Sequence, residues 1–279
     1  PSSVTFGADN GMTLANMKGV EDITDERWST LMDQLTLEEC LIRTGLGGTS
    51  TKVIESITSP EAIQNDGPNG FNSYPLGQYA NSDASTGDPC VIAEDDPNRD
   101  YKMGVMAVET VISKQLAAEW GKAVGNYSLW ANTAIWWGVG TNLHRTPYNA
   151  RNHEYFSEDA VLTAGQSAAI IKAGHEYGVL IAPKHLAFND TEINRTGIAE
   201  FMTEQAAREN ELRGTQSCIE DANALAVMTT YNRVGCVTSN AHTGLLLNIL
   251  HKEWGFKGLM SEDFIQDPAY TKIRMAVHN

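Results

Sequence analysis

The chain has 279 residues, of which 42% are hydrophobic and 20% charged, so it is long enough to enclose a substantial core as one large domain or two small ones. Its 35 acidic and 20 basic residues give a net charge of −15, which disfavours polyanions and predicts no nucleic-acid partner. No run of about 18 consecutive apolar residues occurs, so we expect no membrane-spanning helix and no membrane partner. The four cysteines lack C-x-x-C spacing and are too sparse for a disulfide framework, so we expect free thiols.

Two polar stretches stand out along the chain. Residues 1–30 are irregular in pattern and are expected to form a lead-in or linker segment, which runs into a helix near Trp28. Residues 78–102 are rich in Asn, Asp, Gly and Pro, a composition that predicts a long surface loop. Long loops of this kind are often functional.

From about residue 107 onwards, helical patterns alternate with short apolar runs. Helices separated by short, continuously apolar strands indicate βα units around a parallel sheet that is buried on both faces. The expected helices lie near residues 111–124 and at 158–177, 203–221 and 240–253, and the expected strands at 134–139, 179–182, 225–228 and 258–261.

Two α/β architectures fit this alternation, a (β/α)₈ TIM-like barrel and an open doubly wound sheet. A G-x-G-x-x-G turn after the first strand would favour the open sheet, and the sequence has none. Polar and ionisable residues instead follow several different strands, at 142–145, 184–185, 231–233 and 262–263. Barrel active sites are built from the carboxyl ends of many strands, so this distribution favours the barrel.

Adjacent residues at two strand ends are the first candidates for chemistry. Glu262 and Asp263 point to opposite faces of their strand, so only one of them can face the barrel mouth; the alternative for either is a helix cap or a solvated charge. Lys184 and His185 supply a positive charge, several donors and a neutral acceptor, which suit sugar hydroxyls. The structural alternative is a surface lysine beside a histidine in the core.

Two further candidates lie in loops. Asp66 belongs to a turn by composition and either caps that turn or accepts hydrogen bonds from two neighbouring sugar hydroxyls. Arg151 lies between a strand and a helix and either pairs with Glu154 or donates into the site. No metal-ligand spacing surrounds His144, His153 or His185, so we expect no metal site.

Taken in order, these segments resemble glycoside hydrolase family 3, in its β-glucosidase-like branch, over roughly residues 20 to 279. Five motifs carry the resemblance. They are Asp66-Gly67-Pro68-Asn69-Gly70 (D-G-P-x-G in the family), residues 138–159 (G-P-x-x-N-I-x-R-x-P-x-x-G-R-N-x-E-x-x-S-E-D), residues 184–195 (K-H-F-A-x-N-x-x-E-x-N-R), residues 228–232 (M-x-x-Y-N) and residues 254–258 (W-G-F-x-G).

The resemblance implies a role for each matching position. Asp263 would be the catalytic nucleophile, with Met228 and Tyr231 lining the pocket beside the anomeric carbon. The residues that would bind the glycone hydroxyls are Asp66, Arg151, Lys184 and His185. The family usually has S-D-W or T-D-W at the nucleophile, whereas this chain has Ser261-Glu262-Asp263-Phe264, so a slip of one residue would make Glu262 the candidate.

The implied activity is that of a retaining exo-β-glycosidase that hydrolyses terminal non-reducing β-D-glucosyl residues of a β-glucoside or oligosaccharide through a covalent glycosyl-enzyme. A β-xylosidase or another exo-glycosidase of the family, and a catalytically silent carbohydrate-binding barrel, are the alternatives. The N-acetylglucosaminidase branch is disfavoured because its K-H-F-P-G-H-G loop is absent after Lys184. No cofactor is implied.

In this branch the general acid is a Glu from a separate α/β sandwich domain. The chain ends at Asn279, one helix after the presumed seventh strand, so we expect residues 31–279 to form a barrel that is incomplete at its C-terminus. The sandwich domain is then expected outside this chain as its partner. The sequence is also compatible with a homo-oligomer.

Overall fold

The computed structural model describes residues 4–45, 50–71 and 113–263. The chain divides into two compact units, Pro1–Gln64 and Asn65–Asn279. The surface loop predicted at 78–102 lies outside the described residues, as does Cys90. Cys218 and Cys236 are free thiols, as expected.

The first unit consists of short elements around a small apolar core formed by Met17, Leu31, Leu35, Ile54 and Ile57. The predicted helix near Trp28 is confirmed, and Asp25 caps its start by accepting a hydrogen bond of 2.9 Å from the Arg27 backbone N–H. The elements are η1 (Leu14–Met17), α1 (Glu26–Met32), α2 (Leu37–Gly45), β1 (Ser50–Thr51), η2 (Glu55–Ile57) and β2 (Ala62–Asp66), whose first residues pair antiparallel with β1.

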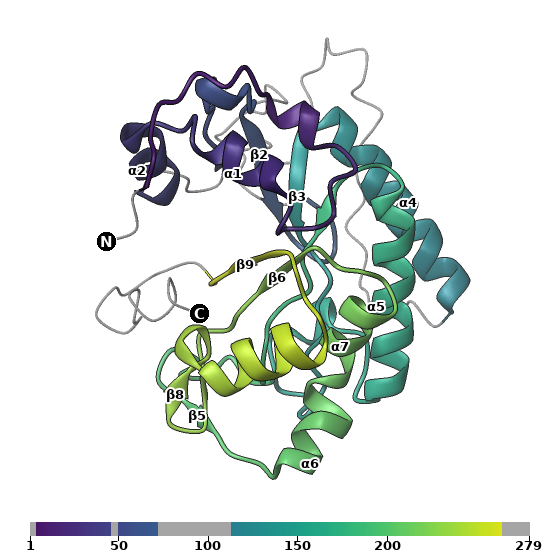
Figure 1. The fold of residues 1–279 in the computed structure, drawn as a ribbon. Helices are drawn as coiled ribbons and strands as arrows, with labels where there is room; N and C mark the ends of the chain where they lie inside the picture. The colour runs from purple at the N-terminus through teal and green to yellow at the C-terminus, as the bar shows by residue number, and fades with distance from the viewer. Residues whose placement is uncertain (1–3, 46–49, 72–112, 264–279) are drawn as a thin grey trace, which may run out of the picture. The chain divides into compact units, whose positions relative to one another are not determined.

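The second unit alternates helices with short strands, and it confirms each of the four predicted strands to within one or two residues (Figure 1). Its main elements are α4 (Lys114–Trp130), β3 (Thr133–Trp137), η4 (Asn152–Glu154), α5 (Ala160–His175), β4 (Leu180–Ile181), α7 (Arg213–Glu220), β6 (Ala226–Met228), η7 (Gly244–Glu253) and β9 (Leu259–Ser261). The shorter elements are β5 (Ala199–Glu200), α6 (Glu204–Ala206), η5 (Ala207–Glu211), β7 (Arg233–Val234), β8 (Val237–Thr238) and η6 (Ser239–Ala241).

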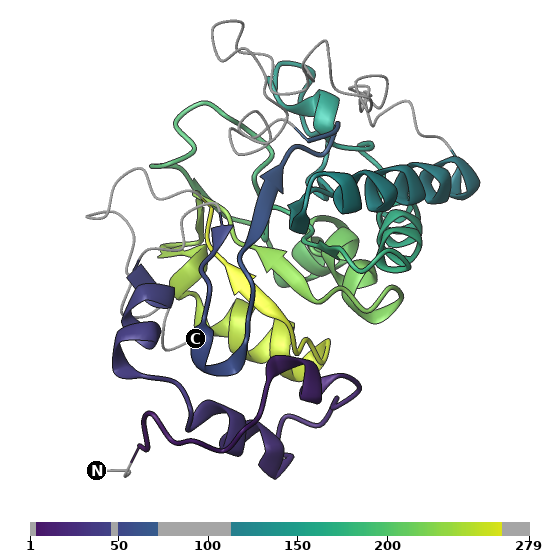
Figure 2. The same cartoon turned by 90° about the horizontal axis from the view of Figure 1, so that it is seen from above.

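The main strands are parallel and follow one another in space in the same order as in the chain. β3 pairs with β4 and β6 pairs with β9, the second pair lying side by side in Figures 1 and 2. Between the two pairs, the Met228 N–H donates to the Pro183 carbonyl at 3.0 Å, and Leu186 bridges Thr229 in parallel. This order is typical of successive βα units. Over the residues that the structure describes, however, the strands do not close into a barrel.

Both faces of these strands are buried, as their continuous apolar runs predict. Trp136, Ile181 and Val227 face the large core shared with the helices, where α4 packs on α5 and α5 on α7. The alternate residues form a separate cluster on the opposite face: Ile135, Trp137, Ala182, Ala226 and Met228.

Two of the predicted helices have irregular geometry. The helix expected over 203–221 is interrupted by η5, a π turn in which the Leu212 N–H donates to the Ala207 carbonyl five residues earlier, at 2.9 Å. The helix expected over 240–253 consists of η6 and the π-helical η7. π turns are rare and often mark functional positions. Within the described residues no helix is long and apolar enough to span a membrane.

Candidate active site

The predicted site residues come from the carboxyl ends of successive strands in the second unit. Asp66 ends β2, and Arg151 lies in the connection after β3. Lys184 and His185 follow β4, and the two peptide bonds Lys184–His185 and Leu186–Ala187 are cis. Tyr231 follows β6 and Asp263 follows β9. The parallel order of the strands therefore collects these residues at one edge.

Lys184 is a buried cation, with only 2% of its side chain exposed. Its Nζ lies 2.5 Å from Asp66 Oδ1 and 3.8 Å from Glu154 Oε2. The Asp66 side chain is 52% exposed, so Lys184 fixes a carboxylate that still faces outward. The interpretation of Lys184 as a surface lysine is therefore wrong, and Asp66 does more than cap a turn.

His185 is fully buried, and its ring is held in one tautomer. The Asn142 amide is oriented by the His185 backbone, because Asn142 Nδ2 donates to the His185 carbonyl and Asn142 Oδ1 accepts from the His185 N–H, both at 3.0 Å. Asn142 Oδ1 also lies 3.1 Å from His185 Nδ1, which must therefore carry the hydrogen. His185 Nε2 is then an acceptor and receives a hydrogen bond of 3.1 Å from Arg151 Nη2.

The charge state of His185 follows from its surroundings. Burial, helped by the positive charges of Arg151, Lys184 and Arg195, holds the pKa of His185 well below its ordinary value. The imidazole is therefore neutral at physiological pH. The 3.5 Å approach of Asp263 Oδ2 to His185 Nε2 is consequently a close packing of polar atoms and not an ion pair.

Arg151 pairs with Glu154 and also contacts His185. Pairing with Glu154 and donation toward the candidate site therefore do not exclude each other. Arg151 forms a bidentate pair with Glu154, in which Nη2 lies 3.1 Å from Oε2 and Nε also donates. Its Nη1 lies 3.5 Å from Glu192 Oε1. Burial alone would lower the pKa of Arg151, but the surrounding anionic groups outweigh it and raise this pKa above its ordinary value.

Asp263 and Glu262 point in different directions, as their alternation on a strand end predicts. Asp263, with 15% of its side chain exposed, lies beside His185 and shares a hydrogen bond with Tyr231. Glu262 instead accepts a hydrogen bond of 2.5 Å from Asn240 in η6. Burial raises the pKa of Glu262, and the Asn240 contact opposes that shift. Of the two acids, Asp263 is the one that lies among the other candidate residues.

Tyr231 and Met228 occupy different environments. Tyr231 lies under the Arg195 guanidinium, whose carbon is 4.7 Å from the ring centroid. Burial and the neighbouring Asp263 carboxylate raise the pKa of Tyr231 above its ordinary value. Met228 packs in the apolar cluster that contains Trp137, directly beneath the strand ends.

Sequence reasoning missed a group of polar residues that hold the candidates in place. Asn189 Nδ2 donates to Glu192 Oε1 at 3.0 Å and to the Tyr155 hydroxyl at 3.3 Å, and that hydroxyl lies 3.2 Å from His185 Nδ1. Arg195 pairs with Glu192 at 2.8 Å. Tyr155, Asn189, Glu192 and Arg195 all lie inside the two longest motifs. The available signal was their membership of those segments, because none of them directly follows a strand.

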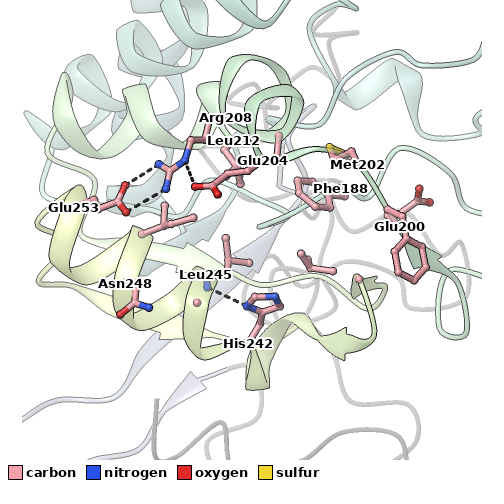
Figure 3. Close-up of a pocket in the computed structure, with 16 residues that line it drawn as sticks. Phe188, Glu200, Met202, Glu204, Arg208, Leu212, His242, Leu245, Asn248 and Glu253 are labelled. Atoms are coloured by element: carbon pink, nitrogen blue, oxygen red, sulfur yellow. Dashed lines mark hydrogen bonds and ion pairs between the residues drawn. The ribbon is translucent and has the colours of Figure 1, made fainter.

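A cavity elsewhere in the second unit has a different character. A separate cavity of about 450 Å³ opens between η5, η7 and the β5–β7 pair, lined mainly by apolar groups such as Met202, Leu212 and Leu245 (Figure 3). None of the predicted site residues lines it. In the described ranges, no three His, Cys, Asp or Glu side chains are grouped so that they could hold a metal ion.

A buried cation, a neutral imidazole, a guanidinium and two carboxylates thus lie together at the ends of parallel strands in an α/β protein. The sequence profile of the glycosyl hydrolase family 3 N-terminal domain matches residues 104–274. The chain belongs to glycosyl hydrolase family 3.

Individual relatives agree with this placement. A beta-glucosidase of Ruminococcus albus is 30% identical over 278 residues, which cover 95% of this chain and 27% of that protein. Beta-glucosidase B of Emericella nidulans is 35% identical over 190 residues, covering 64% of this chain and 22% of the relative. The structure of beta-glucosidase 3B from Thermotoga neapolitana in complex with glucose superposes with a TM-score of 0.71 at 27% identity, over 84% of this chain and 33% of that one. The chain thus spans about a quarter of the length of the curated relatives it matches.

Proposed function

We propose that this chain carries the nucleophile and the glycone-binding residues of a retaining exo-β-glucosidase. The observation that carries the proposal is the position of Asp263, whose carboxylate lies beside His185 and Tyr231 at the same edge as Lys184 and Asp66. Glu262, the alternative nucleophile, is held by Asn240 instead. The curated relatives reported above are named as beta-glucosidases, which supports a β-glucosyl substrate.

The mechanism requires two displacements at the anomeric carbon. An Asp263 oxygen forms a bond to this carbon while the glycosidic C–O bond breaks, and the leaving oxygen takes a proton from a second carboxylic acid. Water then attacks the glycosyl-enzyme, gives its proton to that same acid residue, and releases Asp263 as a carboxylate. Two inversions at one carbon retain its configuration.

The remaining residues suit recognition of the glycone. Asp66 accepts hydrogen bonds from neighbouring hydroxyls while Lys184 supports it from behind, and Arg151 supplies donors. The neutral His185 places no positive charge beside Asp263. Tyr231 and Met228 border the position of the anomeric carbon.

The chain would form part of a (β/α)₈ barrel, with residues 1–30 leading into residues 31–279. Its described strands run parallel in chain order, as successive βα units of a barrel do, and the chain covers about a quarter of the length of its relatives. The general acid would be a Glu of an α/β sandwich domain elsewhere in the complete polypeptide.

The test is turnover of 4-nitrophenyl β-D-glucoside and the matching β-D-xyloside by the complete polypeptide, with the product anomer followed by proton NMR. A preference for the glucoside and first release of the β-anomer are expected. A preference for the xyloside would move the assignment to a β-xylosidase, and first release of the α-anomer would overturn the retaining mechanism. Saturable glucose binding without turnover would identify a silent carbohydrate-binding barrel.

A further inference from the structure

The carboxyl groups of Asp190, Glu200 and Glu211 lie near the guanidinium of Arg145. Asp190 belongs to the same segment as Lys184 and His185. Asp190 and Glu211 are buried, with 1% and 7% exposure, and the two carboxyl groups interact directly. Arg145 Nη1 lies 3.5 Å from Asp190 Oδ2 and 3.3 Å from Glu200 Oε2. The proposed mechanism uses none of these groups.

Asp190 links this cluster to the candidate active site. Its Oδ1 accepts a hydrogen bond of 3.3 Å from the Leu143 N–H, and Leu143 directly follows Asn142, which fixes the His185 backbone and ring. On its other side, Asp190 directly follows Asn189, which binds Glu192 and Tyr155. The Asp190 carboxylate therefore joins the connection after β3 to the connection after β4.

The charges in the cluster do not balance if every acid is ionised. Three carboxylates would face one guanidinium, and Arg145 is half-exposed, so its charge is shared with solvent. Glu211 Oε2 is buried and has no hydrogen-bond partner among the residues that the structure describes. A buried carboxylate oxygen without a donor is costly, whereas the neutral acid is much less so. Burial first, and then the Asp190 charge, raise the pKa of Glu211 to about 9.

The element that carries Glu211 is firmly anchored. Glu211 ends η5, the π turn of the second unit, and Arg208 in the same turn pairs with Glu204 at 2.8 Å and with Glu253 of η7 at 2.7 Å (Figure 3). The turn that carries Glu211 is thus tied to η7 through Arg208.

We propose that Glu211 is a positioning residue: as a neutral acid it donates its carboxyl hydrogen to Asp190, and this pair holds the Lys184–Asp190 segment in its ligand-binding geometry. The inference rests on the proposed function only in assigning that segment to sugar binding. Loss of the shared proton at alkaline pH places two carboxylates against each other, and the segment then loses its support from η5.

The test compares Glu211→Gln with Glu209→Gln in the complete polypeptide. The Glu211→Gln side chain keeps a donor toward Asp190 but cannot ionise, whereas Glu209 is exposed on the same turn and serves as the matched control. The readouts are glucose affinity and the free energy of unfolding, both measured from pH 6 to pH 10. The unfolding readout needs no activity, so it separates failure of this inference from failure of the proposed function.

In the wild type and in Glu209→Gln, glucose affinity is expected to fall as the pH rises through about 9. Glu211→Gln is expected to keep neutral-pH affinity to within about threefold and to move this alkaline loss upward by about one pH unit or more. An unchanged alkaline loss in Glu211→Gln would overturn the proposal, and so would a loss of more than about tenfold at neutral pH. If Glu211→Gln does not fold, the wild type decides: above about pH 6.5, where His185 no longer changes the slope, the proposal requires the unfolding free energy to fall as the pH rises to about 9, and a flat profile over that range contradicts it.

Discussion

At the scale of single residues, the buried Lys184 cation holds the exposed Asp66 carboxylate in position. Replacing it by methionine removes the cation that fixes Asp66 and approaches Glu154. Charged hydrogen bonds contribute about 1.5–3 kcal/mol, so Lys184→Met is expected to weaken glucose binding by roughly 10- to 100-fold. Isothermal titration of the complete polypeptide measures this change. Lys122→Met, which removes an exposed lysine paired with Glu119 at 2.9 Å, should leave affinity unchanged.

The two adjacent acids after β9 give a second prediction at this scale. Asp263→Asn removes the proposed nucleophile and should reduce kcat by about 10³-fold or more. Glu262→Gln keeps the size of its side chain and the contact with Asn240, so kcat should change only a few-fold. Steady-state kinetics on an aryl β-glucoside measure both variants. The reverse pattern would assign the nucleophile to Glu262.

At the scale of elements, the packing of α4 on α5 depends on Gly121. A Cβ at this position would lie 2.3 Å from the Ile170 carbonyl oxygen, so Gly121→Ala must push the two helices apart. Overpacking of this kind typically costs about 1–3 kcal/mol. Denaturant unfolding should show that loss, while Ala123→Val, which adds bulk at an exposed position of the same helix, should cost clearly less. Equal stability of Gly121→Ala and the wild type would contradict this packing.

The elements also show what the sequence could predict. The strands β3, β4, β6 and β9 were found because continuous apolar runs signal burial on both faces. The sequence does not indicate the strands β5, β7 and β8, because a strand of two residues is too short to show an alternation of apolar and polar residues. The π turn at η5 was also missed, because a hydrogen bond that spans one extra residue leaves no mark on the apolar pattern.

The sequence also indicates only part of the candidate site, namely the residues whose position relative to the strands marks them. Residues that directly follow strands, such as Lys184 and Asp263, stand out by position in a βα pattern. Tyr155 and Glu192 lie within long connections between strands and helices. The course of these connections depends on tertiary contacts, so the sequence pattern does not indicate where the two side chains lie. Glu211 lies on a helix face and meets Asp190 only in the folded chain, so neither spacing nor period indicates the pair.

At the scale of the whole molecule, stability should depend on pH through its buried titratable groups. The pKa of His185 is held below its ordinary value, so the unfolded chain takes up a proton that the folded chain excludes. Stability from this group is present above about pH 6.5 and is lost as the pH falls below it. His185→Gln should therefore flatten the acid side of the unfolding free-energy profile. His153→Gln, at an exposed position, should not, and an unaltered profile in His185→Gln would contradict the neutral buried imidazole.

The most direct test of the account is trapping of the glycosyl-enzyme. Incubation of the complete polypeptide with 2,4-dinitrophenyl 2-deoxy-2-fluoro-β-D-glucoside, followed by proteolysis and mass spectrometry, identifies the residue that attacks the anomeric carbon. The good leaving group needs little acid assistance, and the fluorine slows hydrolysis of the intermediate. We predict a fluoroglucosyl adduct on Asp263. An adduct on Glu262, or none on this chain, would contradict it.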